Sequence, residues 1–170
     1  MISIIVFTYR RRERLIQCLK SIDSKNVIEI LLFNDDETEK LDISDFDLLD
    51  ILKNKIKIYN PSDFGFSDRA FRKPIYINIA VELAKCEYIL FSDDDGIFVP
   101  GCIDIHRSAL KNYKFCAGSI VRSRFLNRMS KSILQGTNYS FDKKFFKDVG
   151  GYDETFVQTN GGGDIDFWYR

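Results

Sequence analysis

The stretch EYILFSDDDG, residues 87–96, joins a run of apolar residues directly to three consecutive aspartates. The apolar part, Tyr88 to Phe91, shows little polar alternation, which is typical of a strand covered on both faces of a parallel sheet. Three adjacent carboxylates repel one another, so Asp93, Asp94 and Asp95 need positive charge nearby. The stretch therefore predicts a buried strand that ends in an acidic turn with a cation beside it.

Three further runs have the same apolar character, namely ISIIVF at 2–7, EILLF at 29–33 and KIKIY at 55–59. Between the runs, apolar residues recur at helical spacing within 10–22 and again within 74–84. Helices that connect parallel strands cover both faces of the sheet. The pattern predicts an α/β fold, a three-layer α/β/α, Rossmann-like domain with a mostly parallel central sheet.

The rest of the chain has weaker signals. A helix is expected after Pro100, over 103–110, and strand-like composition returns at 115–121. The segment 41–52 is expected to be a weak helix or an irregular connection. The remainder to 170 is expected to be more irregular, with a helix that begins at Asp164. Since no linker or repeat divides the chain, we expect one domain over residues 1–170.

Composition excludes several classes of protein. The 25 lysines and arginines equal the 25 aspartates and glutamates, so no basic surface for nucleic acid is indicated. The four cysteines lie far apart and only one histidine is present, which makes a structural zinc site improbable and favours reduced thiols in the cytoplasm. The apolar stretch at 2–7 is too short to span a membrane or act as a signal peptide.

Polar residues follow each predicted strand: Thr8-Tyr9-Arg10, Asn34-Asp35-Asp36, Asn60 and Asp93-Asp94-Asp95. In parallel sheets ligands bind beyond the carboxyl ends of the strands, so these residues are expected to share one rim. We expect Asp93 and Asp95 to point in one general direction and to suit Mg²⁺ or Mn²⁺ together with the oxygens of a diphosphate. The alternative is an ordinary solvated acidic turn.

Basic and glycine-rich segments add further candidates. Arg69, Arg72 and Lys73 lie before a predicted helix near the same rim, where they either hold an anionic nucleotide or are solvated. Near the C-terminus, GGGDIDFWYR places three glycines before Asp164, which is either a helix N-cap or a carboxylate base in an acceptor pocket.

In this order the motifs resemble those of the family 2 glycosyltransferases and their relatives with the GT-A fold. The segments that carry the resemblance are SIIVFTYRRRERLIQCLKSI, EILLFNDDETEK, RKPIYINIAVELAKCEYILFSDDDGIFVPGCI, and FFKDVGGYDETF followed by GGGDIDFWYR. The resemblance implies a metal-dependent inverting glycosyltransferase, with a nucleotide-sugar-binding half at 1–100 and an acceptor-binding half at 101–170. The donor is expected to be a UDP-sugar and the acceptor a hydroxyl of a sugar or glycan.

The resemblance also implies a role for each matching residue. Asp164 is the expected catalytic base, and Asp95, supported by Asp93, is the expected ligand of Mn²⁺ or Mg²⁺. The residues expected to bind the nucleotide sugar are Thr8, Tyr9, Arg10, Asp35, Arg69, Arg72, Asp93 and Asp94, and those expected to bind the acceptor are Gly162, Gly163, Asp166 and Trp168.

This sequence departs from the family pattern in three places. Asn34 stands where the family often has an aspartate, and Gly163 stands where many members have a glutamate. The chain also stops at Arg170, within the helix that the acidic motif opens, so truncation at the C-terminus is one interpretation.

Two other functions stay open. A nucleotidyltransferase uses a similar domain, although its glycine-rich phosphate loop is replaced here by Thr8-Tyr9-Arg10-Arg11. The second is a module that binds nucleotide and metal without transferase activity.

Overall fold

The strands of the protein form a mostly parallel sheet, as predicted. The computed structural model describes residues 1–66, 71–119, 137–159 and 162–170, and in these ranges the strands form one six-stranded sheet of order β3-β2-β1-β4-β6-β5. The strands are β1 (Ile2–Thr8), β2 (Val27–Asn34), β3 (Ile56–Tyr59), β4 (Tyr88–Asp93), β5 (Phe115–Ala117) and β6 (Tyr139–Asp142). The first four pair in parallel, while β6 runs antiparallel to both β4 and β5.

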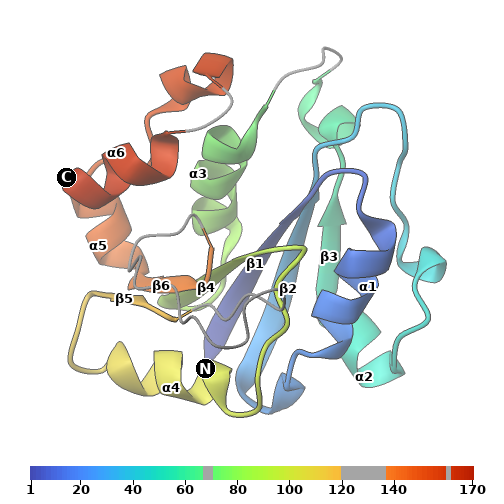
Figure 1. Cartoon of the computed structure of the whole chain (residues 1–170), viewed down its shortest axis with the longest axis horizontal. Helices are drawn as coiled ribbons and strands as arrows, with labels where there is room; N and C mark the ends of the chain where they lie inside the picture. Colours follow the sequence, from blue (N-terminus) through green and yellow to red (C-terminus); the bar gives the residue numbers. More distant parts are fainter. Residues whose placement is uncertain (67–70, 120–136, 160–161) are drawn as a thin grey trace, which may run out of the picture.

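Helices cover both faces of this sheet. The α-helices are α1 (Arg12–Lys20), α2 (Asp50–Lys53), α3 (Lys73–Leu83), α4 (Cys102–Ala109), α5 (Lys143–Asp148) and α6 (Gly163–Tyr169). Short 3-10 helices are η1 (Ser24–Asn26), η2 (Ile43–Asp45), η3 (Pro61–Phe64) and η5 (Glu154–Thr159). Figure 1 shows α1 and α2 on one side of the sheet and α3, α5 and α6 on the other, which is the expected three-layer arrangement.

Strand β1 explains why its sequence lacks polar alternation. Ile4 and Val6 pack in the core on the α1 side, whereas Ile5 and Phe7 pack in the core on the α3 side. Because successive side chains of a strand point to opposite faces, a strand covered on both faces is apolar at most positions, and its buried polar side chains need partners, as Ser3 has in Glu29 at 2.9 Å. All seven residues of β1 are buried.

The carboxyl ends of the parallel strands meet at one rim, also as predicted. Thr8 lies beside Asn34 in the register of β1 and β2, and Phe7 lies beside Asp93 in the register of β1 and β4. The backbone continues this pairing past the strands, since the N–H of Asp35 donates to the carbonyl of Thr8 at 2.9 Å. The polar residues that follow β1, β2 and β4 therefore lie next to one another.

The region after residue 137 is more regular than predicted. Residues 139–142 form β6 and 143–148 form α5, whereas the sequence indicated irregular structure there. The segment 41–52 contains only η2 and the beginning of the short α2. Of the strand-like run 115–121, residues 115–117 form β5, and 120–121 lie outside the described ranges.

Two further expectations concern cysteines and membranes. All four cysteines are free thiols, and burial raises the pKa of Cys18 to about 12, which keeps this thiol protonated and unreactive. Among the described residues, no helix combines the length and the apolar composition needed to cross a membrane.

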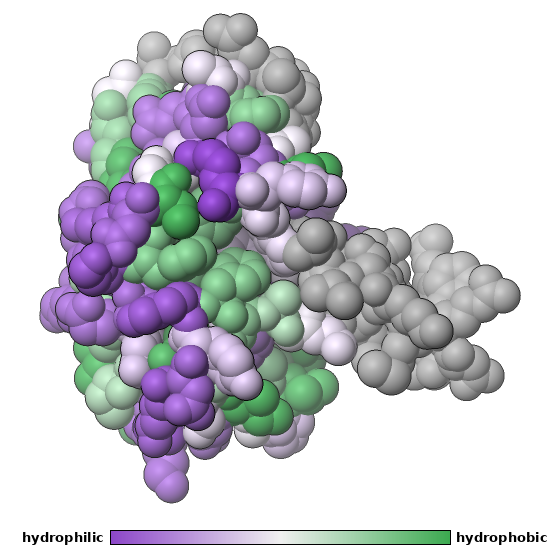
Figure 2. All heavy atoms as spheres, turned by 90° about the vertical axis from the view of Figure 1, so that its left-hand side faces the viewer, coloured by the Kyte–Doolittle hydropathy of each residue, from purple (hydrophilic) through white to green (hydrophobic). Residues whose placement is uncertain are grey.

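The surface formed by α5 and α6 is mixed in character. Viewed from this side, hydrophobic surface lies between hydrophilic side chains (Figure 2). Helix α6 buries Phe167 against the aromatic core, while Ile165 and Tyr169 are exposed.

A glycine pair connects this C-terminal region to α3. Gly150 and Gly151 have φ angles of 85° and 66°, and the following Tyr152 N–H donates to Oδ1 of Asn78 in α3 at 2.9 Å. A Cβ atom at position 151 would lie 2.8 Å from that same Oδ1 and 3.0 Å from a ring carbon of Phe146. The turn thus requires glycine for its backbone angle and for space.

Substitution of this glycine should destabilise the fold more than substitution of an uncrowded one. Gly65 also has a positive φ of 73°, but a Cβ there would meet no atom within 4 Å. Gly65→Ala is expected to lower the free energy of unfolding by about 1 kcal/mol through backbone strain alone. Gly151→Ala should lose roughly 1–3 kcal/mol more because of the steric overlap. Urea denaturation of both variants measures this, and equal losses would contradict the proposed packing.

Candidate functional site

The three aspartates after β4 have three different environments. Asp94 is buried and accepts a hydrogen bond from the Thr8 hydroxyl at 2.6 Å. Asp93 accepts one from Nζ of Lys73 at 2.7 Å. The Asp95 side chain is 43% exposed and lies 3.1 Å from Nη1 of Arg11. Asp95 is therefore the carboxylate of this turn that is most open to a ligand.

Asp93 and Asp95, which were expected to point in one general direction, pair with different cations. Lys73 is the first residue of α3, and Arg11 precedes the first residue of α1. These two helices pack on opposite faces of the sheet. Asp93 pairs with Lys73 at 2.7 Å, whereas Asp95 lies 3.1 Å from Nη1 of Arg11 and 4.0 Å from Nη1 of Arg14.

Protein side chains supply the positive charge that the acidic turn needs. Burial raises the pKa of Asp93, and the charge of Lys73 opposes that rise. Burial likewise raises the pKa of Asp94, while the Thr8 hydrogen bond and the charge of Arg11 oppose it. Lys73 and Arg11 thus perform, in this structure, the neutralising role for which the sequence suggested a metal ion.

The donor atoms of the turn still suit a divalent ion. No group of three or more His, Cys, Asp or Glu side chains converges in a possible metal site within 1–66, 71–119, 137–159 and 162–170. However, Mg²⁺ and Mn²⁺ commonly use one or two protein carboxylates and take their other oxygens from water and substrate phosphates. An exposed Asp95 fits this kind of site, and Asp93 fits it less well because it is paired with Lys73.

A second acidic group at the rim is buried with an arginine. Arg72 donates from Nη1 to Oδ1 of Asp35 at 2.9 Å, and its backbone N–H donates to Oδ2 at 3.3 Å. Burial raises the pKa of Asp35 to about 6, while these hydrogen bonds and the charge of Arg72 oppose the rise. The Arg72 guanidinium also lies over the Phe66 ring, 5.2 Å from its centre. The pair presents fixed polar groups beside apolar rings, which suits a nucleoside.

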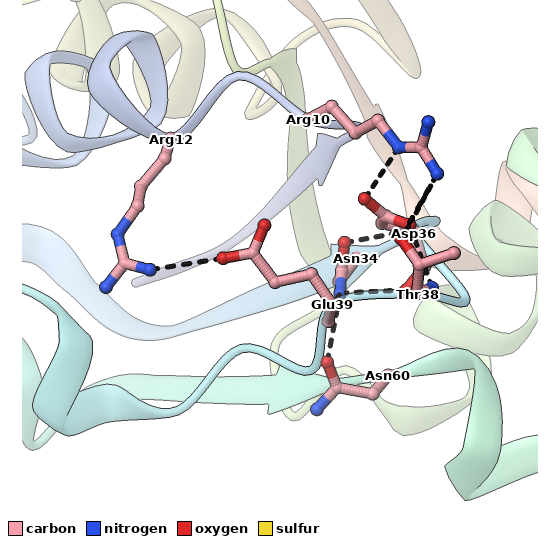
Figure 3. A network of polar contacts seen from close by, with 7 residues as sticks. All are labelled: Arg10, Arg12, Asn34, Asp36, Thr38, Glu39 and Asn60. Carbon is pink, nitrogen blue, oxygen red and sulfur yellow. Dashed lines mark hydrogen bonds and ion pairs between the residues drawn. The ribbon is translucent and has the colours of Figure 1, made fainter.

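The loop after β2 is held by a polar network (Figure 3). Arg10 donates from Nε and Nη2 to the two carboxylate oxygens of Asp36 at 2.7 and 3.2 Å. This contact, with hydrogen bonds from Thr38, lowers the pKa of Asp36 to about 2. The Asn34 amide donates to Asn60 and to the backbone of the same loop. Asn34 is therefore a structural residue in this protein.

A cavity of about 330 Å³ opens between this loop and the start of α1. Its lining residues are Thr8, Arg10, Arg11, Arg12, Leu15, Asn34, Asp36, Thr38, Glu39 and Leu41. The volume is of the order found for small-molecule sites. Of the predicted nucleotide-binding residues, Thr8 and Arg10 line it. Tyr9 lies beside Arg10, whose guanidinium is 5.0 Å from the centre of the Tyr9 ring.

The C-terminal candidates lie near the start of α3. Gly162, with φ of 92°, is the N-cap of α6, so Asp164 is the second residue of that helix and not its cap. Gly163 is buried, and a Cβ there would meet Tyr152 at 3.4 Å and Pro74 at 3.5 Å. Pro74 follows Lys73, the partner of Asp93. The first turn of α6 and the acidic turn are thus attached to the same end of α3.

A pair of buried tyrosines is affected by the charges of both Asp93 and Asp164. The hydroxyls of Tyr139 and Tyr152 are 2.7 Å apart. Burial is the main cause that raises the pKa of both hydroxyls, and the charges of Asp93 and Asp164 raise both further. Asp164 and Asp93 therefore act on the same two buried hydroxyls.

Two predicted acceptor residues have partners within the chain. Asp166 pairs with Arg170 at 2.6 Å, and the Trp168 ring packs against those of Phe115 and Tyr139 at 5.2 and 5.6 Å between centres. Arg69 lies outside the described residues. Lys73 was a candidate for binding an anionic nucleotide, but its pairing with Asp93 was not predicted, and Arg11, the partner of Asp95, was not among the predicted site residues.

The chain belongs to the glycosyl transferase family 2, because the model of that family matches residues 3–161. The structure of S. aureus TarS 1–349 is similar, with a TM-score of 0.67 and 18% identity over 98% of this chain and 53% of that one. The mannosyltransferase PcManGT from Pyrobaculum calidifontis, in complex with GDP-Man and Mn²⁺, has a TM-score of 0.63 and 13% identity over 90% of this chain and 47% of that one.

TarS 1–349 in complex with UDP-GlcNAc is also similar, with a TM-score of 0.59 and 15% identity over 89% of this chain and 48% of that one. At these identities the likeness establishes the fold, which is the predicted GT-A fold. The chain spans about half the length of TarS 1–349 and of PcManGT.

Proposed function

We propose that this chain is the catalytic domain of a metal-dependent inverting glycosyltransferase. It moves a sugar from a nucleotide-diphosphate-sugar donor to a hydroxyl of a sugar or glycan acceptor. The observation that carries the proposal is the exposed carboxylate of Asp95 after β4, at the same rim of the sheet as the buried pair of Asp35 and Arg72 after β2. Related folds that hold UDP-GlcNAc, or GDP-Man with Mn²⁺, support a donor of this class. A UDP-sugar is our first candidate.

The donor is held by the residues around the acidic turn. Asp35 and Arg72 bind the base, and Thr8 and Asp94 bind the ribose. Tyr9, Arg10 and Arg69 complete the nucleotide site. Asp95, assisted by Asp93, holds Mn²⁺ or Mg²⁺, which supplies positive charge to the departing diphosphate when bound.

The acceptor is activated by Asp164. Its carboxylate, in the first turn of α6, takes the proton of the acceptor hydroxyl as that oxygen attacks the anomeric carbon from the face opposite the diphosphate. One displacement of this kind inverts the anomeric configuration. On the resemblance to the family, we assign Gly162, Gly163, Asp166 and Trp168 to the acceptor side of this base. The free cysteines support a cytoplasmic location for this chemistry.

A donor panel tests the function directly. UDP- and GDP-sugars are incubated with Mn²⁺ and a set of sugar acceptors, and released nucleoside diphosphate is measured. Asp95→Asn should abolish release in the presence of Mn²⁺, because the amide provides no anionic ligand. Asp47→Asn is the matched control, since Asp47 is fully exposed and pairs with Lys20 far along α1. Full Mn²⁺-dependent activity in Asp95→Asn would contradict the metal assignment.

The same panel discriminates between the functions that the sequence left open. Binding of a nucleoside diphosphate without transfer to any acceptor would indicate a binding module. Pyrophosphate formed from a nucleoside triphosphate and a sugar phosphate would indicate a nucleotidyltransferase.

Replacing the proposed base should affect transfer and leave donor binding intact. Asp164→Asn is expected to lower the transfer rate by about 10²- to 10⁴-fold, the usual worth of a general base. Donor affinity, measured by calorimetry, should be unchanged. Asp148→Asn serves as control, because Asp148 is an exposed residue of α5 paired with Lys144. A loss in Asp164→Asn of less than about tenfold would show that another group removes the proton.

Donor binding should weaken in acid because of Asp35. The ionised carboxylate accepts hydrogen bonds from the base, and its pKa in the free protein is about 6. Affinity should therefore be constant above about pH 7 and fall by up to about tenfold per pH unit below about pH 6. The probe is an intact nucleotide sugar, whose diphosphate does not titrate in this range. Asp35→Asn should bind more weakly at neutral pH and lose this pH dependence; a profile unchanged in the variant would exclude Asp35 as its source.

A further inference from the structure

Arg11 forms an ion pair with Asp95, the most accessible carboxylate of the acidic turn. Its Nη1 lies 3.1 Å from Oδ2 of Asp95 and 3.4 Å from Oδ1 of Asp94. Asp94 is buried and already bonded to Thr8, whereas the Asp95 side chain is 43% exposed and is the more open of the two partners. The Arg11 side chain is itself 50% exposed. The contact is thus an ion pair that is able to open without unfolding the core.

The backbone before α1 directs two successive arginines to two different strand ends. Arg10 has a φ of 55°, a left-handed conformation that a side chain with a Cβ rarely adopts. With this turn, Arg10 reaches Asp36 beyond β2 while Arg11 reaches Asp95 beyond β4. Strain of this kind persists where the surrounding contacts determine it. The backbone position of Arg11 is therefore set by the fold, while its half-exposed side chain is able to move.

A divalent ion and Arg11 compete for the same oxygen atoms. A guanidinium remains charged at any pH at which the protein is folded, so it is unable to yield its place by losing a proton. Arg14 also lies near Asp95, with its Nη1 4.0 Å from Oδ2, but Arg11 is closer at 3.1 Å. A divalent ion that binds Asp95 adds two positive charges to the site and repels Arg11 most strongly. The displaced guanidinium then needs another anion.

We propose that Arg11 is an exchangeable counterion that also binds the donor. In the free protein it neutralises Asp95; when a divalent ion takes Asp95, Arg11 moves to the diphosphate oxygens of the donor. This inference rests on the proposed function. A guanidinium forms paired hydrogen bonds with phosphate as readily as with carboxylate, so the exchange preserves its bonding.

The exchange makes metal and diphosphate binding mutually dependent. Metal alone binds weakly because it must displace Arg11 without giving it a new partner. Metal together with diphosphate binds tightly because Arg11 gains phosphate contacts. By linkage each ligand raises the affinity for the other by the same factor.

Removal of the guanidinium should change two affinities in opposite directions. In Arg11→Met, Mn²⁺ alone, titrated by calorimetry or electron paramagnetic resonance, should bind up to about fivefold more tightly, the worth of a partly exposed ion pair. UDP and GDP are then titrated with saturating Mn²⁺, and the one that binds the unmodified chain should bind at least about tenfold more weakly, the worth of a charged hydrogen bond.

Two further variants isolate the cause. Arg12→Met removes the same charge from the next position, but Arg12 pairs with Glu39 and Asp45, so neither affinity should change in this way. In an Asp95→Asn background, Arg11→Met should no longer tighten Mn²⁺ binding. Arg11→Lys keeps the charge without the paired geometry and should retain weak binding of Mn²⁺ alone.

The possible results separate this inference from the proposed function. Mn²⁺ affinity that is unchanged or lower in Arg11→Met overturns the competition, and unchanged diphosphate affinity overturns the contact with phosphate. If neither UDP nor GDP binds the unmodified chain with Mn²⁺, the proposed function and the phosphate contact both fail. In that case the Mn²⁺ titrations still decide whether Arg11 competes with Mn²⁺ for Asp95. If Arg11→Met no longer tightens Mn²⁺ binding in the Asp95→Asn background, Asp95 is the site of that competition.

Discussion

Three consecutive carboxylates at the end of a buried strand need positive charge, and the rim of this sheet is organised around that need. Lys73 approaches Asp93 from one face, Arg11 approaches Asp95 from the other, and the Thr8 hydroxyl bonds the buried Asp94 between them. The parallel sheet makes this possible because it brings the ends of β1 and β4 side by side. The three aspartates are thus unequal in exposure, partner and expected chemistry.

The parallel half of the fold could be predicted because its physics is local in sequence. A strand buried on both faces is apolar at most positions, and 2–7, 29–33 and 87–91 each contain only one polar residue. Strand β6 has only four residues and is paired antiparallel on both sides. Its place depends on contacts with β4 and β5, which a short window of sequence does not contain. For the same reason the helix that follows it, α5, was not predicted.

The site could be predicted only in part. The strand-end rule brought Thr8, Asp35 and Asp94 to one rim, and the structure places them there. The rule does not say which cation each carboxylate selects, since that depends on the face that each helix covers. One contact was available in the sequence: Asp166 and Arg170 are four residues apart in a predicted helix, a spacing that favours an ion pair.

The start of α3 joins the two halves of the chain. Its first residue, Lys73, holds Asp93, and its second, Pro74, packs against Gly163, one residue before Asp164. Proline restricts the backbone at the first turn of a helix, and glycine allows the closest approach of another backbone. The acidic turn after β4 and the first turn of α6 therefore both contact the start of α3. A Cβ atom at position 163 would already be in van der Waals contact with Tyr152, Phe156 and Pro74, at 3.4–3.5 Å, so the longer glutamate that many family members carry here would require these neighbours to move.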